Sequence, residues 1–183
     1  MTLLEDISSI SNEQIELVEK LTLRWIFQAT LDFGMEAFEI FLKSPDDVKD
    51  VAEDITREFL DRLPGFNIPQ RIFGTVDYKK ARYVILPEWI IRQALFVDSK
   101  AEKENRSATI QMSQTSMHIN QLRSQNYIYE KGRLPPISIY NNKQYLTTTT
   151  FVHFKYNDVE TKHYLEEATL FCLPNGLLQT IYA

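Results

Sequence analysis

Cysteine is nearly absent from the chain: Cys172 is the only one among 183 residues, so no internal disulfide can form. It lies in the apolar run 170–173, where we expect the thiol to pack as a small core side chain. The three histidines, at positions 118, 153 and 163, have no partner ligands at the spacing of a zinc site, and we interpret them as structural. A disulfide scaffold and a zinc module are therefore excluded, and a reducing cytoplasm is the expected location.

Long apolar runs and a secretory signal are also lacking. Residues 1–13 contain three acidic side chains and no basic one, so they have neither the positive start nor the apolar stretch of a signal peptide. The stretch 27–41 is interrupted by three acidic residues and does not reach membrane-spanning length. We find no repeat, low-complexity segment or linker. We therefore expect one soluble domain over residues 1–183, with a helical part at about 1–65 and a mixed-sheet part at about 66–183.

The net charge of −5 is unevenly distributed along the chain. Residues 1–65 hold 15 acidic and 6 basic side chains, whereas residues 66–183 hold 10 acidic and 14 basic ones. Any phosphate contacts are therefore expected from the second part. Charge alone is equally compatible with a solvated acidic surface that binds no partner.

The first part is expected to be helical. Ser11 and Gln14 have the spacing of a capping box, and apolar residues then recur at helical spacing until Gly34, which is expected to end the helix. A shorter helix is expected at about 35–42. The sequence Ser-Pro-Asp-Asp at 44–47 is a strong start signal for a further amphipathic helix.

The second part is expected to be a sheet, because from residue 71 onwards β-branched and aromatic runs alternate with turn signals. Six strands are predicted, at residues 71–77, 81–86, 92–98, 137–140, 145–156 and 163–173. Ser107 is expected to cap a helix that runs to about Leu122, and turns are expected at 141–142 and 175–176. The order of the elements predicts an α/β fold, more specifically an α+β mixed sheet flanked by helices.

An acid-x-Lys tripeptide occurs at residues 47–49, 77–79, 98–100 and 160–162. About one or two occurrences are expected by chance in a chain this charged. The first and the last have structural explanations, a helical first turn and a polar connection. Asp98 and Lys100 differ, because an uninterrupted apolar strand runs into them and the period-two alternation points both to one side. A carboxylate and an ammonium at the edge of a core indicate a functional site.

A divalent cation and a phosphodiester would explain such a pair. Mg²⁺ prefers oxygen ligands, commonly one or two carboxylates with water and phosphate, so a second acid is needed near Asp98. Asp77 is the candidate, because it ends a predicted strand and one hairpin separates it from the Asp98 strand. Lys100 would position the attacking water or help to deprotonate it. The alternative is a partly exposed network of ion pairs.

Two segments resemble the active-site segments of a known family. FGTVDYK at 73–79 and LFVDSKA at 95–101 are similar to those of the SfiI-type type II restriction endonucleases, in the PD-(D/E)xK nuclease superfamily. Further similar segments occur in the same order along the chain, at residues 18–24, 52–56, 105–106, 113–114 and 151–154. The match runs from about residue 12 to about residue 175.

The resemblance implies a restriction endonuclease-like core and Mg²⁺-dependent cleavage of both DNA strands at a palindromic, GC-rich, interrupted site. It makes Asp77 and Asp98 metal ligands and Lys100 the catalytic lysine. Asn105 and Arg106 fall in the segment that approaches the bases, and a guanidinium can bond both O6 and N7 of guanine. The sequence alone is equally compatible with an exposed Arg106 before the cap of the next helix.

Two weaker pairs of candidates lie on predicted helices. Glu53 or its neighbour Asp54 would assist metal binding, as an upstream helical acid often does in such folds. Periodicity does not choose between them, and an exposed helix surface is the favoured alternative for both. Gln111 and Gln114 would orient water or contact phosphate, although polar residues on an exposed helix face are the commoner finding.

The chain departs from the family pattern in two places. One residue fewer separates Lys100 from the pair Asn105 and Arg106. Family members also continue beyond the point that corresponds to Ala183 and take part of their DNA contacts from that extension. The chain is accordingly either a smaller relative with altered specificity or part of a longer protein, and the recognition sequence is not carried over.

Cleavage of a palindrome requires two equivalent active sites, so a homodimer is the minimum assembly, and the resemblance also permits a homotetramer. The acidic helices are expected oligomer contacts, because DNA would repel them. Two alternative functions stay open: a structure-specific or repair nuclease with the same core, and a non-catalytic module for DNA binding or assembly. The latter would have lost a core residue, whereas all three are present.

Overall fold

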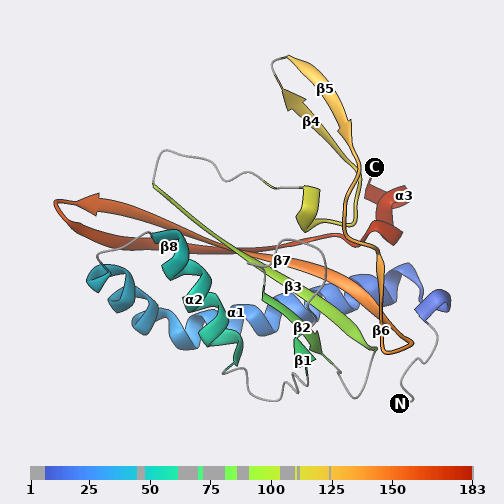
Figure 1. The fold of residues 1–183 in the computed structure, drawn as a ribbon, viewed down its shortest axis with the longest axis horizontal. Coiled ribbons are helices and arrows are strands. Elements are labelled where there is room, and N and C mark those ends of the chain that lie inside the picture. The colour runs from blue at the N-terminus through green and yellow to red at the C-terminus, as the bar shows by residue number, and fades with distance from the viewer. Residues whose placement is uncertain are drawn as a thin grey trace.

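The computed structural model describes residues 7–44, 48–61, 70–71, 81–85, 91–103, 110, 112–123 and 125–182. Two long helices open it, α1 (Asn12–Lys43) and α2 (Val48–Asp61), and the short 3-10 helix η1 (Ile7–Ser9) precedes them. The strands are β1 (Gln70–Arg71), β2 (Ala81–Ile85), β3 (Gln93–Lys103), β4 (Ile119–Arg123), β5 (Asn126–Glu130), β6 (Ile137–Tyr140), β7 (Lys143–Val159) and β8 (Lys162–Leu173). The 3-10 helices η2 (Met112–Gln114) and η3 (Gly176–Leu178) and the short helix α3 (Gln179–Tyr182) complete the described elements (Figure 1).

One continuous helix, α1, takes the place of the two that the sequence predicts. The expected capping box is present: the Gln14 N–H donates to Ser11 Oγ (3.3 Å), and the Ser11 N–H donates to Gln14 Oε1 (2.9 Å). The expectation that Gly34 ends the helix is wrong. Buried side chains continue past it at helical spacing, at positions 26, 29, 33, 37 and 41. Their packing outweighs the cost of a mid-helix glycine, about 1 kcal/mol. None of the described helices combines the length and apolarity needed to cross a membrane.

α2 begins at Val48 in the described residues and packs its apolar face on the sheet, as predicted. Ala52 and Ile55 are at most 2% exposed. Ser44, the first residue of the expected start signal, instead ends α1, because its N–H donates to a carbonyl of the last turn (3.0 Å). The other residues of that signal, 45–47, lie outside the described residues.

The strands form a mixed sheet, as the sequence predicts. Its order is β1-β2-β3-β7-β6, and β8 also pairs with β7. β3 and β7 run parallel, whereas the other pairs are antiparallel. β7 has 17 residues, so one of its edges pairs with β3 while β6 and β8 share the other. This strand therefore brings residues 93–103 alongside residues 146–156, which are far apart in sequence.

The predicted turn between β6 and β7 is present. Asn141 and Asn142 have φ values of 48° and 57°, in the left-handed region that asparagine tolerates better than most residues. At the second expected turn, Asn175 acts as the N-cap of η3, and its side chain accepts a hydrogen bond from the Leu177 N–H (2.8 Å).

α1 and α2 cover one face of the sheet. The core between them and the sheet contains Ile26, Phe33, Phe41, Ile55, Leu95, Val97, Val152 and Phe154. The sheet residues in this set alternate along β3 and β7, so the residues between them face the other way. The long helix α1 runs along the length of the sheet (Figure 1).

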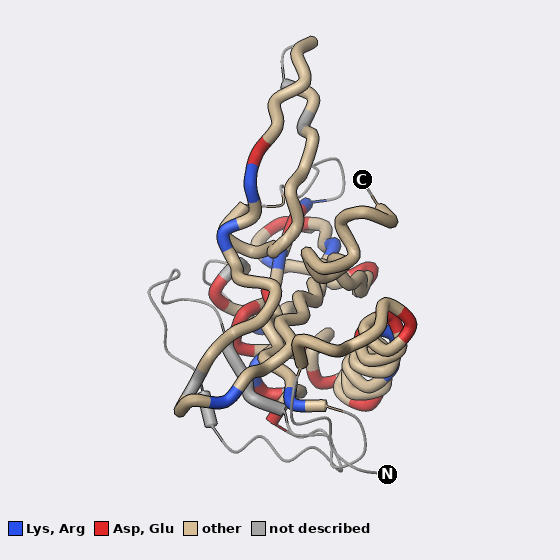
Figure 2. The backbone as a smooth tube through the Cα atoms, turned by 90° about the vertical axis from the view of Figure 1, so that its right-hand side faces the viewer, with Lys and Arg blue, Asp and Glu red and all other residues tan. Residues whose placement is uncertain are grey.

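The helix expected from Ser107 to about Leu122 is wrong. Residues 107–109 lie outside the described residues, but 112–118 form η2 and an irregular stretch, and β4 follows. β4 pairs with β5 in a hairpin that projects from the body of the molecule (Figure 1, Figure 2). Cross-strand hydrogen bonds in this hairpin, and bonds from 112–118 to distant residues, replace the local bonds of a helix.

The 112–118 segment is fixed first to the chain that follows the hairpin. The N–H groups of residues 133 and 134 donate to the carbonyls of Met112 (2.9 Å) and Thr115 (3.0 Å). A Cβ at Gly132 would lie 2.4 Å from a carbonyl oxygen of the segment, so only glycine permits this close approach.

The same segment is also fixed to residues near the end of β8. The Gly176 N–H donates to Ser116 Oγ (2.8 Å), and the His118 N–H donates to Gln179 Oε1 (2.7 Å). Its shape is thus set by contacts with parts of the chain that follow it at two separate places in the sequence.

Glu19 is a buried acid on α1, only 8% exposed, whose Oε1 accepts a hydrogen bond from the Asn175 N–H (2.6 Å). Burial raises the pKa of Glu19 to about 7; the Asn175 hydrogen bond opposes this rise, and the charge of Glu16 adds to it. Burial, with a contribution from Glu19, also raises the pKa of Cys172 to about 12. The Cys172 thiol therefore stays protonated at neutral pH.

Replacing Glu19 by Gln is expected to flatten the dependence of stability on pH. A carboxyl group with a raised pKa in the folded state stabilises the fold below its ordinary pKa of 4.5, and this contribution is lost as pH rises through about 7. Between about pH 5 and about pH 8, the wild-type free energy of unfolding should fall by about 1–3 kcal/mol more than that of Glu19→Gln. Urea unfolding at both pH values measures this, and equal pH dependence in the two proteins would contradict the raised pKa.

Candidate active site

β3 brings Asp98 and Lys100 to one face of the sheet. Its odd positions from 95 to 99 face α1 and α2, so the even positions face the other way. In the parallel register, Asp98 lies opposite Phe151 of β7 and Lys100 lies opposite His153. The strand also continues five residues beyond its predicted end, so both side chains lie within a regular strand.

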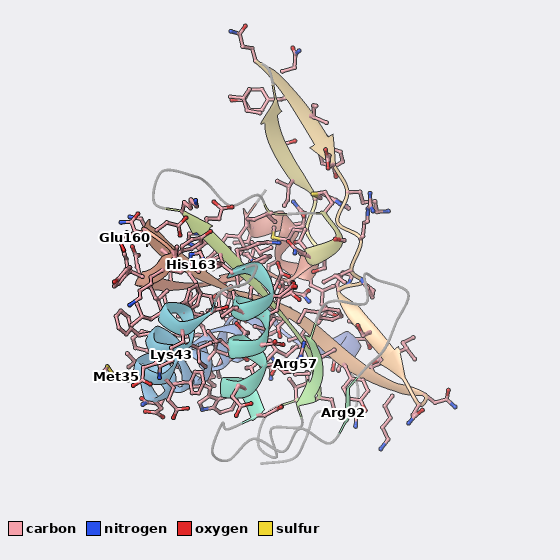
Figure 3. All side chains as sticks on the ribbon, turned by 60° about the vertical axis from the view of Figure 1, so that its left-hand side comes forward. Met35, Lys43, Arg57, Arg92, Glu160 and His163 are labelled. Carbon is pink, nitrogen blue, oxygen red and sulfur yellow. The ribbon has the colours of Figure 1, made fainter. Side chains whose placement is uncertain are left out.

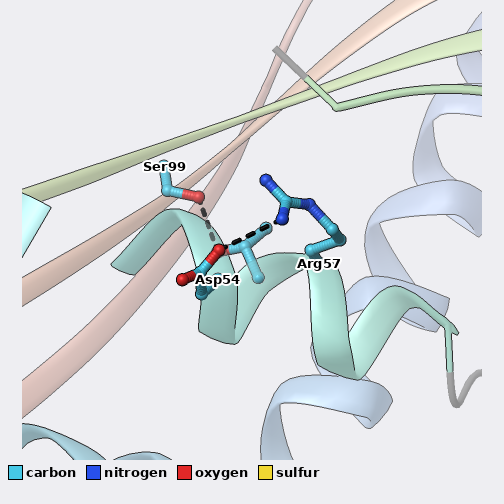
Figure 4. Close-up of polar contacts among 4 residues, drawn as sticks. Asp54, Arg57 and Ser99 are labelled. Carbon is cyan, nitrogen blue, oxygen red and sulfur yellow. Dashed lines mark hydrogen bonds and ion pairs between the residues drawn. The ribbon is translucent and has the colours of Figure 1, made fainter. Parts of the chain in front are cut away.

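Ser99, between these two residues, points to the opposite face. Its Oγ donates to Thr56 Oγ1 of α2 at 2.6 Å, and both side chains are buried (Figure 4). A buried hydroxyl pair of this kind is costly to separate, because each group would lose its partner without regaining water. The contact therefore fixes which side of β3 faces α2.

The helical acids Glu53 and Asp54 lie on α2, which packs on the Ser99 face of β3. The Asp54 carboxylate is 73% exposed and pairs with Arg57 at 3.1 Å (Figure 4). The structure does not bring Asp54 to Asp98. Assistance by Glu53 stays a prediction, and its helix lies over the face of the sheet opposite to Asp98.

Asp98 and Lys100 form an ion pair that is largely shielded from solvent. Lys100 Nζ lies 2.9 Å from Asp98 Oδ2, and the two side chains are 18% and 12% exposed. Charges at this depth attract each other but have lost most of their hydration, so such a pair adds little net stability. A chemical role explains its place directly after the buried apolar residues 94–97 better than a stabilising one.

Gln114 of η2 is the second partner of Asp98. Its amide Nε2 donates to Oδ2, the same oxygen that Lys100 contacts. The residue is 2% exposed, in contrast to the exposed helix face that was the commoner expectation. Among the described residues, both contacts of the Asp98 carboxylate are made by Oδ2, so Oδ1 is left for another ligand. The phosphate contact of Gln114 stays a prediction.

His153 is expected from the sequence to be structural, but it lies next to the ion pair. It lies opposite Lys100, and its buried Nε2 has no hydrogen-bond partner within the described residues. A buried ring nitrogen in that state is uncommon, and here it lies beside the site. No local signal marks it, because its proximity depends on the pairing of strands more than 50 residues apart.

Asp77, Asn105 and Arg106 lie outside the described residues. Across the described ranges, no group of three or more His, Cys, Asp or Glu side chains is arranged to hold a metal ion. Asp98 Oδ1 makes no hydrogen bond or ion pair with a described residue, and a shielded carboxylate oxygen in that state suits a hard cation. A metal centre here needs at least one further acid, as the sequence predicts.

Comparison with protein families gives a match over most of the chain. The family model described as type II restriction enzyme SfiI matches residues 30–182. The type II restriction enzyme SfiI of Streptomyces fimbriatus is 33% identical over 193 residues, which cover 97% of this chain and 72% of that protein.

Comparison with solved structures agrees. The crystal structure of the tetrameric restriction endonuclease SfiI bound to cognate DNA matches with a TM-score of 0.80 and 30% identity, over 97% of this chain and 72% of that one. The restriction endonuclease BglI, bound to its DNA recognition sequence, matches with a TM-score of 0.73 over 90% and 74% of the two chains. At 14% identity, the likeness to BglI shows the fold alone. The family match and the 33% identity across nearly the whole chain together show that the protein belongs to the SfiI family of type II restriction endonucleases.

Proposed function

We propose that this protein hydrolyses phosphodiester bonds in both strands of duplex DNA at a specific palindromic site, with Mg²⁺ as cofactor. The observation that carries the proposal is the ion pair of Asp98 and Lys100, 2.9 Å apart on the face of the sheet that α1 and α2 leave uncovered. Membership of the SfiI family supplies the reaction class. The sequence resemblance extends the proposal to a GC-rich, interrupted site.

Asp98 and Asp77 are the proposed ligands of the cation. Ala81 lies opposite Val97, the residue before Asp98. The sequence places Asp77 four residues before Ala81, and four residues span at most about 14 Å. Chain connectivity therefore limits how far the second carboxylate can lie from the first, and this limit is compatible with a shared ion.

Lys100 is the proposed catalytic lysine. A bound Mg²⁺ ion would neutralise charge on the scissile phosphate and lower the pKa of the attacking water. Lys100 would position that water through its ammonium group, and the ion pair with Asp98 holds this group at the site before DNA binds. The contact of Ser99 with α2 keeps both side chains on a rigid strand, which such geometry requires.

Asn105 and Arg106 are the proposed base-reading residues. They follow the end of β3 at Lys103 by two and three positions. Residues so close to the catalytic strand would meet the same duplex on which Lys100 acts. A guanidinium can bond guanine at two points in the major groove, in keeping with a GC-rich site.

Loss of either charged group at the site is expected to abolish specific cleavage. Asp98→Asn removes the metal-binding charge and Lys100→Met removes the ammonium, so each should lower the rate of plasmid cleavage at least about 100-fold in Mg²⁺. Asp54→Asn is the matched control, because Asp54 is exposed on the other face of the sheet, and it should cleave like the wild type. Discrete fragments from a sequenced plasmid, with thermal melting to show folding, measure the effect.

The pattern of products separates the proposal from its alternatives. Cleavage only at forks, flaps or ends would favour a structure-specific or repair nuclease. Binding of DNA without cleavage by the wild type would favour a non-catalytic module. Discrete fragments that persist in Asp98→Asn would refute the assigned site.

A homodimer is the proposed minimum assembly, and the SfiI crystal structure, which is tetrameric, supports an oligomer. Phe27, Leu31 and Met35 of α1 are 51%, 58% and 76% exposed, and their spacing places them on one face of the helix. Met35 points away from the molecule (Figure 3). A Cβ at Gly34 would meet no atom within 4 Å, so the surface beside Met35 is open to another helix. We assign this apolar row to contact with a second copy, because its acidic surroundings disfavour DNA.

Replacing Leu31 and Met35 together by Glu is expected to weaken self-association at least about 100-fold, because both side chains would be buried in the contact. Light scattering after size exclusion, over a range of protein concentrations, measures the mass. Leu122→Glu is the matched control, since Leu122 is equally apolar and 63% exposed on the hairpin. An unchanged mass in the double variant would place the interface elsewhere.

A further inference from the structure

The contact between Gln114 and Asp98 joins two elements that the sequence keeps 16 residues apart. The donor is a neutral amide, and the acceptor Oδ2 already faces the ammonium group of Lys100. Two donors on one oxygen fix the rotation of the carboxylate and leave the other oxygen for a cation. Only one of these donors carries charge.

The burial of Gln114 indicates that its amide holds Asp98 and does not contact DNA. Gln114 is 2% exposed, so a phosphate could reach it only after the protein rearranged. A buried amide is costly unless it is hydrogen-bonded, and the Asp98 carboxylate supplies an acceptor. The position of Gln114 is therefore set by the folded protein.

The position of Gln114 is fixed by hydrogen bonds of the residues next to it. Its neighbour Thr115 accepts from the N–H of Leu134 (3.0 Å), and Met112 at the start of η2 accepts from the N–H of Arg133 (2.9 Å). On the other side, Ser116 Oγ accepts from the Gly176 N–H (2.8 Å). A long, flexible glutamine side chain is thereby held from a fixed backbone, as a group that orients a metal ligand must be.

We propose that Gln114 is a positioning residue that holds Asp98 in the orientation required to bind the catalytic cation; this rests on the proposed function. Lys100 cannot hold that orientation alone, because the mechanism directs its ammonium group to the attacking water. The neutral amide adds no charge that would repel a cation. It keeps Asp98 aligned while Lys100 turns to the substrate.

The test compares Gln114→Met with Gln28→Met. Methionine keeps the length of the side chain and fills the space without a donor. Gln28 also donates an amide hydrogen bond to a carboxylate, that of Asp32 (2.8 Å), but on the exposed surface of α1. Binding of Ca²⁺ by calorimetry, the Mg²⁺ concentration needed for half-maximal cleavage, DNA affinity without metal, and thermal melting are measured for each.

Gln114→Met is expected to weaken Ca²⁺ binding about 10-fold and to raise the required Mg²⁺ concentration by a similar factor, with cleavage restored at high Mg²⁺. Its DNA affinity without metal should equal that of the wild type, and Gln28→Met should match the wild type in Ca²⁺ binding and in the Mg²⁺ requirement.

Two outcomes would overturn the inference alone, in a wild type that cleaves DNA. Lower DNA affinity of Gln114→Met with an unchanged Mg²⁺ requirement would make Gln114 a DNA contact. Ca²⁺ binding and a Mg²⁺ requirement that both equal those of the wild type would show that the amide does not orient Asp98. A wild type that neither cleaves DNA nor binds Ca²⁺ would instead refute the proposed function, and this inference with it.

Discussion

The parallel pairing of β3 with β7 is the constraint on which the candidate site depends. It aligns Gln93 with Leu146 and continues in register to Lys103 and Tyr156. Because the side-chain period of a strand is two, a slip by one residue would turn Asp98 and Lys100 into the helix-covered core. Three buried hydrogen bonds oppose such a slip: Ser99 bonds Thr56 of α2, and Gln93 bonds Thr22 of α1 and Thr148 of β7. The same packing that forms the core therefore sets the direction of the charged pair.

The Asp98 carboxylate is held from two independent parts of the chain. Lys100 approaches from its own strand, in which residues two apart face the same side. Gln114 approaches from the 112–118 segment, whose shape depends on residues before β6 and after β8. The β4–β5 hairpin leaves the body of the molecule directly after this segment (Figure 1). The base of the hairpin and the site carboxylate thus share one support.

Sequence reasoning succeeded where the signal is local. The Ser11 capping box, the turn at Asn141 and Asn142, and the charged pair that follows the apolar residues 94–97 can each be identified from a few neighbouring residues. It failed where tertiary contacts determine the secondary structure. Gly34 stays helical because the side chains on both sides of it pack on the same sheet, and the helix expected to reach Leu122 gives way to cross-strand pairing. The contact of Asp98 with Gln114 and the position of His153 opposite Lys100 follow from the folded shape of distant segments, for which single-sequence patterns carry no signal.

The position of the helices also reconciles an acidic chain with DNA. Residues 1–65 carry most of the excess negative charge, and the described helices α1 and α2 within them cover one face of the sheet. Asp98 and Lys100 lie on the other face, so the thickness of the sheet and its packing layer, about 10 Å, separates them from the helix surface. A duplex at the site would therefore lie at least this far from the outer surface of the helices, and charges whose separation through solvent exceeds the Debye length of about 8 Å are largely screened at physiological ionic strength. The excess negative charge belongs to residues 1–65, whereas residues 66–183, with 10 acidic and 14 basic side chains, are net positive, so the net charge of −5 does not exclude a basic surface near the site.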